Sequence, residues 1–313
     1  MSNFYIGVDM GGTLIKIAVV DDKANIIEDA VVKTDVTASP KEIIKNITDV
    51  FKKFKSYNKV KTIGIGIAGD IDFKNGIVRF SPNLPKWNKV PLKKEIEKLT
   101  KKTVFVDNDA NTAAIGAYWL DVKAKADNMV CVTLGTGVGG GIIINKKLFR
   151  GNSGTAGEIG HITIVPDGNK CNCGNTGCAE TYIGVRHVVR DALNLLKGKK
   201  SKHIMKLANN DTKQITPKLL SEAAQKGDIV AKQVWVNAGQ KLGILLSDII
   251  NFINPDYIVL CGGISNAGKL IIEPAKQQIK IRAFKTASKL CKIVISKYTS
   301  KLGVVGAAML VKN

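Results

Sequence analysis

The chain begins with a pattern of apolar and polar positions that predicts three strands joined by short turns. Residues 5–34 read YIGVDMGGTLIKIAVVDDKANIIEDAVVKT, in which β-branched runs alternate with a Gly-Gly turn and an Asp-Asp-Lys turn. Apolar residues then recur at helical spacing over 40–55, and the run at 62–68 is apolar throughout, as in strands buried on both faces. This pattern predicts an antiparallel meander followed by a helix and a central strand.

The second half of the chain repeats this beginning. Residues 129–145, MVCVTLGTGVGGGIIIN, again predict a strand, a glycine turn and a strand. Farther along, the pattern is mostly helical, with a long amphipathic segment at 228–253, buried strands at 257–261 and 292–296, and a closing helix from about Gly303. Two halves built on one plan predict an α/β protein with two domains around a cleft, where ligands usually bind.

Length and composition support this picture. A chain of 313 residues exceeds the size at which one hydrophobic core usually keeps growing, which favours two domains. No apolar run approaches the roughly 18 residues that a membrane helix needs, and the N-terminus enters a strand without a targeting segment. We therefore expect a cytoplasmic protein with no membrane partner.

The net charge of +21 raises the question of nucleic-acid binding, because phosphate neutralisation dominates such binding. Only five of the 47 basic residues are arginine, the residue best suited to bidentate phosphate and base contacts. The lysines are spread over predicted helix faces, as at Lys41, Lys45 and Lys52. This distribution favours a lysine-rich surface and no nucleic-acid partner.

The first glycine turn has the composition of an anion-binding site. In the sequence DMGGT, Gly11 and Gly12 leave backbone N–H groups accessible, and Thr13 adds a hydroxyl donor. Asp9 supplies a carboxylate near any bound Mg²⁺. Taken alone, this turn is equally typical of a tight hairpin.

The second turn, at Gly135, Thr136 and Gly137, offers the same parts, and the pair is a stronger indication of phosphate binding than either turn alone. The glycine spacing here also satisfies the dinucleotide-binding motif, but the strand at 142–144 stands where that motif requires a helix. A P-loop-like segment farther on carries Leu270 in place of the hydroxyl residue that binds Mg²⁺. We exclude both of these motifs.

An acidic segment follows the predicted strand at 103–106. Asp107, Asn108 and Asp109 precede a helix that begins near Ala110, and one of them is expected to cap that helix. Capping does not need all three side chains. A carboxylate at a strand end that faces a cleft can also accept the proton of a substrate hydroxyl during phosphoryl transfer.

Three cysteines lie within eight residues of one another, in the sequence CNCGNTGC. Together with His161, the thiols of Cys171, Cys173 and Cys178 form the ligand set of a closed, structural Zn²⁺ site. In a reducing compartment, clustered cysteines more often bind metal than form disulfides. The alternative is three reduced thiols beside a core histidine.

These motifs occur in an order that resembles the ROK (repressor, open reading frame, kinase) family of sugar kinases over nearly the whole chain. The motifs are the two glycine turns, Asn108–Asn111, Gly157–His161 and Cys171–Glu180. The resemblance implies the actin-like, ribonuclease H-like fold of two α/β domains flanking a cleft, with Mg-ATP as cofactor and a homodimer as the common assembly. It places one domain at 1–109, joined by the C-terminal helix at about 300–313, and the other at 110–299.

The resemblance also assigns roles to residues. It implies that Asp109 is the general base and that the Cys₃His site is structural, fixing the position of His161. The implied sugar-binding residues are Gly69, Asn83, Asn108, Asp109, Glu158, His161 and Glu180. The implied nucleotide-binding residues are Asp9, Gly11, Gly12, Thr13, Gly135, Thr136 and Gly137 for the phosphates and Gly262 and Gly263 for the adenosine.

The expected function is ATP-dependent phosphorylation of glucose at its 6-hydroxyl, a step of carbohydrate metabolism. Fructose, mannose, allose, N-acetylglucosamine and N-acetylmannosamine stay open as alternative substrates, because they largely share the hydroxyls that these residues contact. A sugar-responsive transcription regulator is a rival, although the turn at Asp9 leaves no room before it for a helix-turn-helix domain. A zinc module that binds nucleic acid is a second rival.

Overall fold

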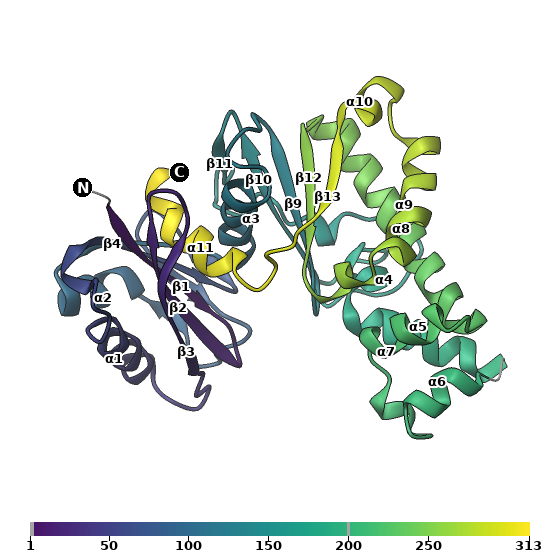
Figure 1. Ribbon diagram of the computed structural model, residues 1–313, viewed down its shortest axis with the longest axis horizontal. Helices are drawn as coiled ribbons and strands as arrows, with labels where there is room; N and C mark the ends of the chain where they lie inside the picture. Colours follow the sequence, from purple (N-terminus) through teal and green to yellow (C-terminus); the bar gives the residue numbers. More distant parts are fainter. Residues whose placement is uncertain (1–2, 199–200) are drawn as a thin grey trace. The chain divides into compact units, whose positions relative to one another are not determined.

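A computed structural model describes residues 3–198 and 201–313 of the chain (Figure 1). The chain divides into two compact units. The first unit comprises Met1–Cys131, Gly141–Gly157 and Ser296–Asn313, and the second comprises Val132–Gly140 and Glu158–Ile295. The domains expected from the sequence, 1–109 with 300–313 and 110–299, are a different division and stay a prediction.

A five-stranded sheet in the order β3-β2-β1-β4-β8 forms the centre of the first unit. Its strands are β1 (Phe4–Met10), β2 (Leu14–Asp21), β3 (Ile26–Lys33), β4 (Val60–Ile67) and β8 (Thr103–Asn108). The first three pair antiparallel, which confirms the predicted meander, and β1, β4 and β8 are parallel neighbours. The C-terminal ends of β1, β4 and β8 therefore share one edge, where open α/β sheets usually bind ligands.

The first helix, α1 (Pro40–Phe51), begins with a capping box in which the side chains of Ser39 and Glu42 satisfy each other's backbone N–H groups. Its apolar face packs into the core of the first unit. The sequence pattern extended this helix to Lys55, which is wrong at the C-terminal end. The chain leaves the helix after Phe51, and Phe54 enters the same core from a turn.

Several shorter elements complete the first unit. Its other α-helices are α2 (Leu92–Thr100), α3 (Asp109–Leu120) and α11 (Leu302–Ala308), and its 3₁₀ helices are η1 (Tyr57–Lys59) and η5 (Met309–Lys312). A separate small sheet consists of β5 (Asp70–Asp72), β6 (Ile77–Phe80) and β7 (Asn88–Val90). This small sheet was not predicted, because strands of three or four residues leave little periodicity to detect.

A second five-stranded sheet has the order β11-β10-β9-β12-β13. Its strands are β9 (Met129–Leu134), β10 (Val138–Ile144), β11 (Lys147–Phe149), β12 (Tyr257–Cys261) and β13 (Lys292–Ile295). The order is the same as in the first sheet when strands are numbered within each sheet. The repeated plan inferred from the two glycine-turn hairpins is therefore present in the fold.

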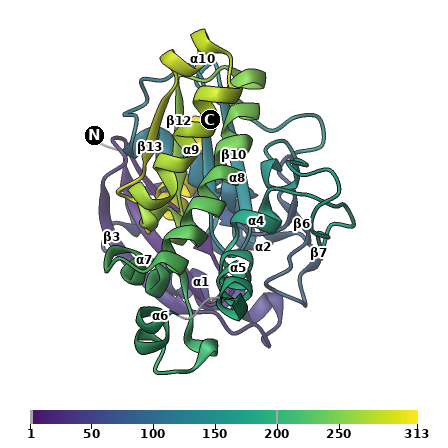
Figure 2. The same cartoon turned by 90° about the vertical axis from the view of Figure 1, so that its right-hand side faces the viewer.

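Helices make up most of the second unit. Its α-helices are α4 (Glu180–Ile183), α5 (Val185–Gly198), α6 (Lys202–Leu207), α7 (Pro217–Gln225), α8 (Ile229–Ile253), α9 (Lys269–Arg282) and α10 (Lys285–Leu290). Its 3₁₀ helices are η2 (Ile159–His161), η3 (Thr212–Gln214) and η4 (Gly263–Ala267). Two views show α8 and α9 side by side (Figures 1 and 2). Across the described residues, no helix has both the length and the apolar character needed to cross a bilayer.

The helix α11 lies close against β1 and β4 in the first unit. A Cβ atom at Gly7 would overlap the carbonyl oxygen of Val304, and one at Gly64 would overlap that of Ala307. Glycine in these strands therefore allows the helix backbone to approach the sheet. The same packing brings Gly303, at the start of α11, against the carboxylate of Asp9.

Candidate active site

The predicted site residues fall into two sets, one in each unit. The set in the first unit consists of Asp9, Gly11, Gly12, Thr13, Gly69, Asn83, Asn108 and Asp109. The set in the second unit consists of Gly135, Thr136, Gly137, Glu158, His161, Glu180, Gly262 and Gly263, together with Cys171, Cys173 and Cys178. Each set is described by itself.

In the first unit, strand register places the acidic residues at one sheet edge. Met10, Ile67 and Asn108 are consecutive partners across β1, β4 and β8. Asp9 is therefore one residue before the end of β1, while Asp109 directly follows β8. Because these strands are parallel, the two carboxyl groups belong to the same edge.

Asn108 caps α3, as the sequence predicted for one residue of this segment. Its Oδ1 accepts a hydrogen bond from the backbone N–H of Ala110 at 2.8 Å, and its Nδ2 donates to the carbonyl oxygen of Gly69 at 3.2 Å. The backbone of Gly69 has φ +133°, in the region that favours glycine. The side chain of Asn108 thus joins the end of β8 to the residue that precedes β5.

The carboxyl group of Asp109 is held at the N-terminus of α3. Its Oδ1 accepts a hydrogen bond from the backbone N–H of Ala110 at 3.0 Å. Burial raises the pKa of Asp109 above the ordinary aspartate value, although backbone N–H groups and the Asn108 side chain act in the opposite direction. A carboxylate with a raised pKa is a better proton acceptor than an ordinary exposed aspartate.

Asp9 is the second carboxyl group at this edge. Burial raises its pKa, the ammonium group of Lys16 lowers it, and the negative charge of Asp109 raises it. Two carboxyl groups that repel one another provide a suitable place for a divalent cation, which takes oxygen ligands. The chemistry of Asp9 therefore fits the predicted Mg²⁺, which its carboxylate would help to hold.

The first glycine turn is held in place from both sides. The backbone N–H of Gly11 donates to the carbonyl oxygen of Leu14 at 3.1 Å, and the Thr34 hydroxyl donates to the carbonyl oxygen of Gly11 at 2.8 Å. A Cβ atom at Gly12 would stand 3.0 Å from the Cβ atom of Asn83. Asn83, predicted to bind sugar, thus lies against the turn predicted to bind phosphate, while Thr13 is exposed.

Sequence reasoning missed the residue that pairs with Asp107. The Nε atom of Arg150 lies 2.7 Å from Asp107 Oδ2, and these side chains are 16% and 3% exposed. Asp107 Oδ1 also accepts hydrogen bonds from Asn111 Nδ2 and from the backbone N–H of Asn108, both at 2.8 Å. The guanidinium of Arg150 stacks over Phe73 at 4.9 Å. This buried ion pair supports the segment that carries Asn108 and Asp109.

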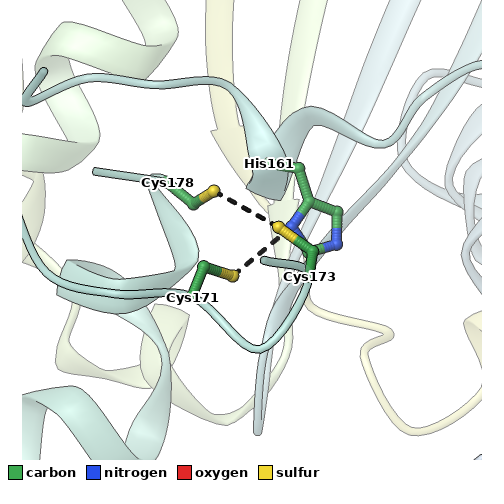
Figure 3. A group of neighbouring side chains, drawn as sticks. All are labelled: His161, Cys171, Cys173 and Cys178. Atoms are coloured by element: carbon green, nitrogen blue, oxygen red, sulfur yellow. Dashed lines mark hydrogen bonds between the residues drawn. The ribbon is translucent and has the colours of Figure 1, made fainter. Parts of the chain in front are cut away.

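In the second unit, the cysteine cluster has the dimensions of a metal site (Figure 3). The four ligand atoms of His161, Cys171, Cys173 and Cys178 lie within 4.8 Å of one another. The Sγ atoms of Cys173 and Cys178 are 3.7 Å apart, and His161 Nδ1 is 3.7 Å from Cys171 Sγ. A tetrahedral zinc ion with Zn–S bonds of about 2.3 Å has S–S edges of about 3.8 Å. The residues present therefore fit a zinc ion.

The two nitrogens of His161 face different groups. Nδ1 faces the thiols, whereas Nε2 lies 3.9 Å from Oε2 of Glu158, which is exposed and predicted to bind sugar. Metal ligation at Nδ1 would leave Nε2 as a donor on the side of Glu158. Glu180 also contacts the cluster, with its Oε1 3.7 Å from Cys171 Sγ.

The second glycine turn lies against the segment that follows this cluster. Oε2 of Glu180 accepts a hydrogen bond from the backbone N–H of Val138 at 3.2 Å, directly after Gly137. A Cβ atom at Gly262, where φ is +95°, would overlap the backbone of Leu134 at the end of β9. The structure therefore brings the predicted adenosine residue Gly262 next to the start of the predicted phosphate turn.

Comparison with known proteins identifies the family of the chain. A profile described as the ROK family matches residues 5–313. The chain is 33% identical to a glucokinase of Thermotoga maritima over 98% of this chain and 97% of that enzyme. The chain belongs to the ROK family. Its resemblance to this family, inferred from the order of motifs, is thereby confirmed.

A solved ROK structure confirms the fold class. The glucokinase of Streptomyces griseus, solved in complex with glucose and AMPPNP, has a TM-score of 0.81 and 35% identity over 98% of this chain and 99% of that one. The predicted actin-like α/β fold therefore holds for this ROK protein. A xylose repressor of Caldicellulosiruptor bescii is also 30% identical, over 98% of this chain and 77% of the repressor. Family membership alone thus does not separate kinases from regulators.

The first prediction concerns the cysteine cluster of this ROK protein. We expect about one zinc ion per chain, measured by elemental analysis of the purified protein, and loss of that zinc in Cys173→Ser. Cys291→Ser is the matched control, because Cys291 lies outside the cluster, and it should retain the metal. Equal zinc contents in the two variants, or no zinc in the wild type after incubation with zinc, would contradict the assignment.

The second prediction concerns the ion pair beneath the carboxylate segment. Arg150→Met leaves Asp107 buried without its cation and should lower the free energy of unfolding by about 3–5 kcal/mol. Arg79→Met is the control, because Arg79 pairs with Asp70 at 2.9 Å and both side chains are more than 40% exposed. That exposed pair should contribute less than about 1 kcal/mol. Chemical denaturation measures the free energy of unfolding of both variants. Equal losses in the two would show that burial does not increase the contribution of the Arg150–Asp107 pair to stability.

Proposed function

We propose that this protein is an ATP-dependent sugar kinase that phosphorylates glucose at its 6-hydroxyl. The observation that carries the proposal is the half-buried Asp109 carboxyl group, whose pKa is raised, at the same sheet edge as Asp9. Such a group suits proton abstraction from an alcohol. Full-length similarity to the glucokinases of Thermotoga maritima and Streptomyces griseus supports glucose as the acceptor.

In this proposal, Asp109 accepts the proton of the sugar hydroxyl as its oxygen attacks the terminal phosphorus of ATP. Asn108, already fixed as the cap of α3, and Asn83 hold sugar hydroxyls in the first unit. Gly69 contributes backbone atoms beside Asn108. Each of these residues acts by orienting the acceptor, which reduces the entropy that the reaction must overcome.

The remaining sugar contacts are proposed for the second unit. Glu158, His161 and Glu180 accept from or donate to sugar hydroxyls, with the imidazole of His161 oriented by the cysteine cluster. A bound zinc ion would be structural, holding Cys171, Cys173, Cys178 and His161. Removal of the metal would therefore disturb sugar affinity before it altered the chemical step.

The glycine turns serve the nucleotide in this proposal. The backbone N–H groups of the turns at Gly11–Thr13 and Gly135–Gly137 donate to phosphate oxygens, and Gly262 and Gly263 flank the adenosine. Mg²⁺ bound near Asp9 would supply positive charge to the phosphates. These residues stabilise charge as it develops on the transferring group.

The sugar preference and the assembly are finer points of the same proposal. We propose a cytoplasmic homodimer with a small sugar as its partner and no nucleic-acid or membrane partner. In an ADP-release assay with glucose, fructose, mannose, allose, N-acetylglucosamine and N-acetylmannosamine, glucose should have the highest kcat/KM. A higher kcat/KM for another sugar would make that sugar the preferred substrate in place of glucose. If none of the six sugars were phosphorylated, the kinase activity would be refuted in favour of a sugar-responsive regulator.

The general base has its own prediction. Asp109→Asn should lower kcat by about 10²- to 10⁴-fold with a much smaller change in glucose affinity, because the base acts on the chemical step. The carboxylate works deprotonated, so wild-type kcat/KM should fall as pH drops through its pKa. Burial raises that pKa, so this acid limb should lie above 3.8 and should be absent in Asp109→Asn.

A matched control is Asp49→Asn, because Asp49 lies on the exposed face of α1, paired with lysines. This control should retain wild-type turnover and the same pH profile. Wild-type kcat in Asp109→Asn, measured with glucose and ATP, would exclude Asp109 as the base.

A further inference from the structure

Glu180 connects two parts of the second unit that have separate predicted roles. It is the first residue of α4, two positions after Cys178. Its Oε1 faces the cysteine cluster, 3.7 Å from Cys171 Sγ, and its Oε2 accepts a hydrogen bond from the backbone N–H of Val138 at 3.2 Å. One carboxyl group therefore contacts both the surroundings of His161 and the second glycine turn.

The glycine at position 137 makes this contact possible. A Cβ atom there would overlap Oε2 of Glu180. The φ angle of Gly137 is not in the left-handed region, so its backbone conformation does not itself require glycine. Gly135, in the same turn, has no atom within 4 Å of its own Cβ position. A methyl group at position 137 would therefore displace the Glu180 carboxylate, the movable end of that side chain.

The turn also contacts the residues that directly follow α4, Gly184 and Val185. The backbone N–H of Val185 donates to the carbonyl oxygen of Gly135 at 3.0 Å, and the N–H of Gly135 donates to the carbonyl oxygen of Gly137 at 3.0 Å. A Cβ atom at Gly184 would lie 2.7 Å from the carbonyl oxygen of Thr136. These contacts and the Glu180–Val138 hydrogen bond connect the turn to residues 180–185, so we expect displacement of the turn to move the Glu180 carboxylate.

The hydrogen bond also has an electrostatic consequence. The carboxylate of Glu180 occupies a backbone N–H at the end of the turn that is proposed to hold phosphate, so carboxylate and phosphate compete for that region. A sugar hydroxyl that donates to Glu180 satisfies part of its charge and weakens this competition. Sugar binding should therefore strengthen phosphate binding, and by linkage the nucleotide should strengthen sugar binding by the same factor.

We propose that Gly137 is a positioning residue for Glu180, and that the Glu180–Val138 hydrogen bond couples sugar binding to nucleotide binding. This inference rests on the proposed function, because it takes Glu180 as a sugar ligand and the turn as a phosphate site. It adds a residue of the nucleotide turn to the determinants of sugar affinity.

Glucose binding by calorimetry, with and without a non-hydrolysable ATP analogue, tests the inference. The wild type should bind glucose about 5- to 150-fold more tightly with the analogue, the usual range of coupling between sites. In Gly137→Ala, glucose binding without any nucleotide should weaken at least about tenfold, because the added methyl displaces a sugar ligand. In this variant, the ratio of the glucose dissociation constants measured without and with the analogue should approach one.

Gly135→Ala is the matched control in the same turn, since its added methyl meets open space. It should leave glucose affinity without nucleotide at the wild-type value. An equal loss of glucose affinity in Gly135→Ala and Gly137→Ala would overturn the inference, because the effect would then belong to the turn as a whole.

A double-mutant cycle with Glu180→Asp keeps the test decisive if Gly137→Ala alone folds poorly. The shorter side chain withdraws from Gly137, so adding Gly137→Ala to Glu180→Asp should change glucose affinity less than twofold. Wild-type affinity and coupling in Gly137→Ala, or additive losses in the cycle, would refute the coupling while leaving the kinase proposal intact. A wild type that neither binds nor phosphorylates glucose would refute both.

Discussion

Parallel pairing of β1, β4 and β8 is the constraint on which the proposed chemistry depends. It brings Asp9 and Asp109 to one edge of one sheet, although 100 residues separate them in the chain. Two carboxyl groups at such an edge repel one another, and burial raises the pKa of each. Their positions suit different roles, with Asp9 near a cation and Asp109 as the proton acceptor.

The support beneath that edge is itself electrostatic. Asp107 is almost fully buried and depends on Arg150 for its charge balance and on Asn111 for a hydrogen bond. Asn108 caps α3 and contacts Gly69, so the residue next to the proposed base cannot adopt another conformation without breaking the cap. A rigid base is the condition for efficient proton transfer at a fixed distance.

The second five-stranded sheet repeats the strand order of the first. Its glycine turn follows β9 as the first turn follows β1, and the cysteine cluster stands beside it with His161 and Glu180. The carboxylate of Glu180 bonds to the turn at Val138. A residue proposed to bind sugar and a turn proposed to bind phosphate are therefore adjacent within the second unit.

Much of this could be predicted from the sequence, for reasons that differ between elements. Strands such as β12 (Tyr257–Cys261) carry a dense apolar signal, and the predicted zinc ligands are close in sequence with a characteristic set of donor types. Arg150 could not be predicted, because its partner Asp107 lies 43 residues away and the pattern around it resembles any exposed position. The Val138–Glu180 bond, 42 residues apart, had no local signal either.

The position of Asp109 relative to the sugar is the central claim, and a crystal structure with glucose and a non-hydrolysable ATP analogue measures it most directly. The account predicts one carboxylate oxygen of Asp109 within about 2.6–3.2 Å of the glucose 6-hydroxyl, the reach of a hydrogen bond to a general base. A 6-hydroxyl that is hydrogen-bonded elsewhere, with the Asp109 carboxylate turned away from it, would contradict the account.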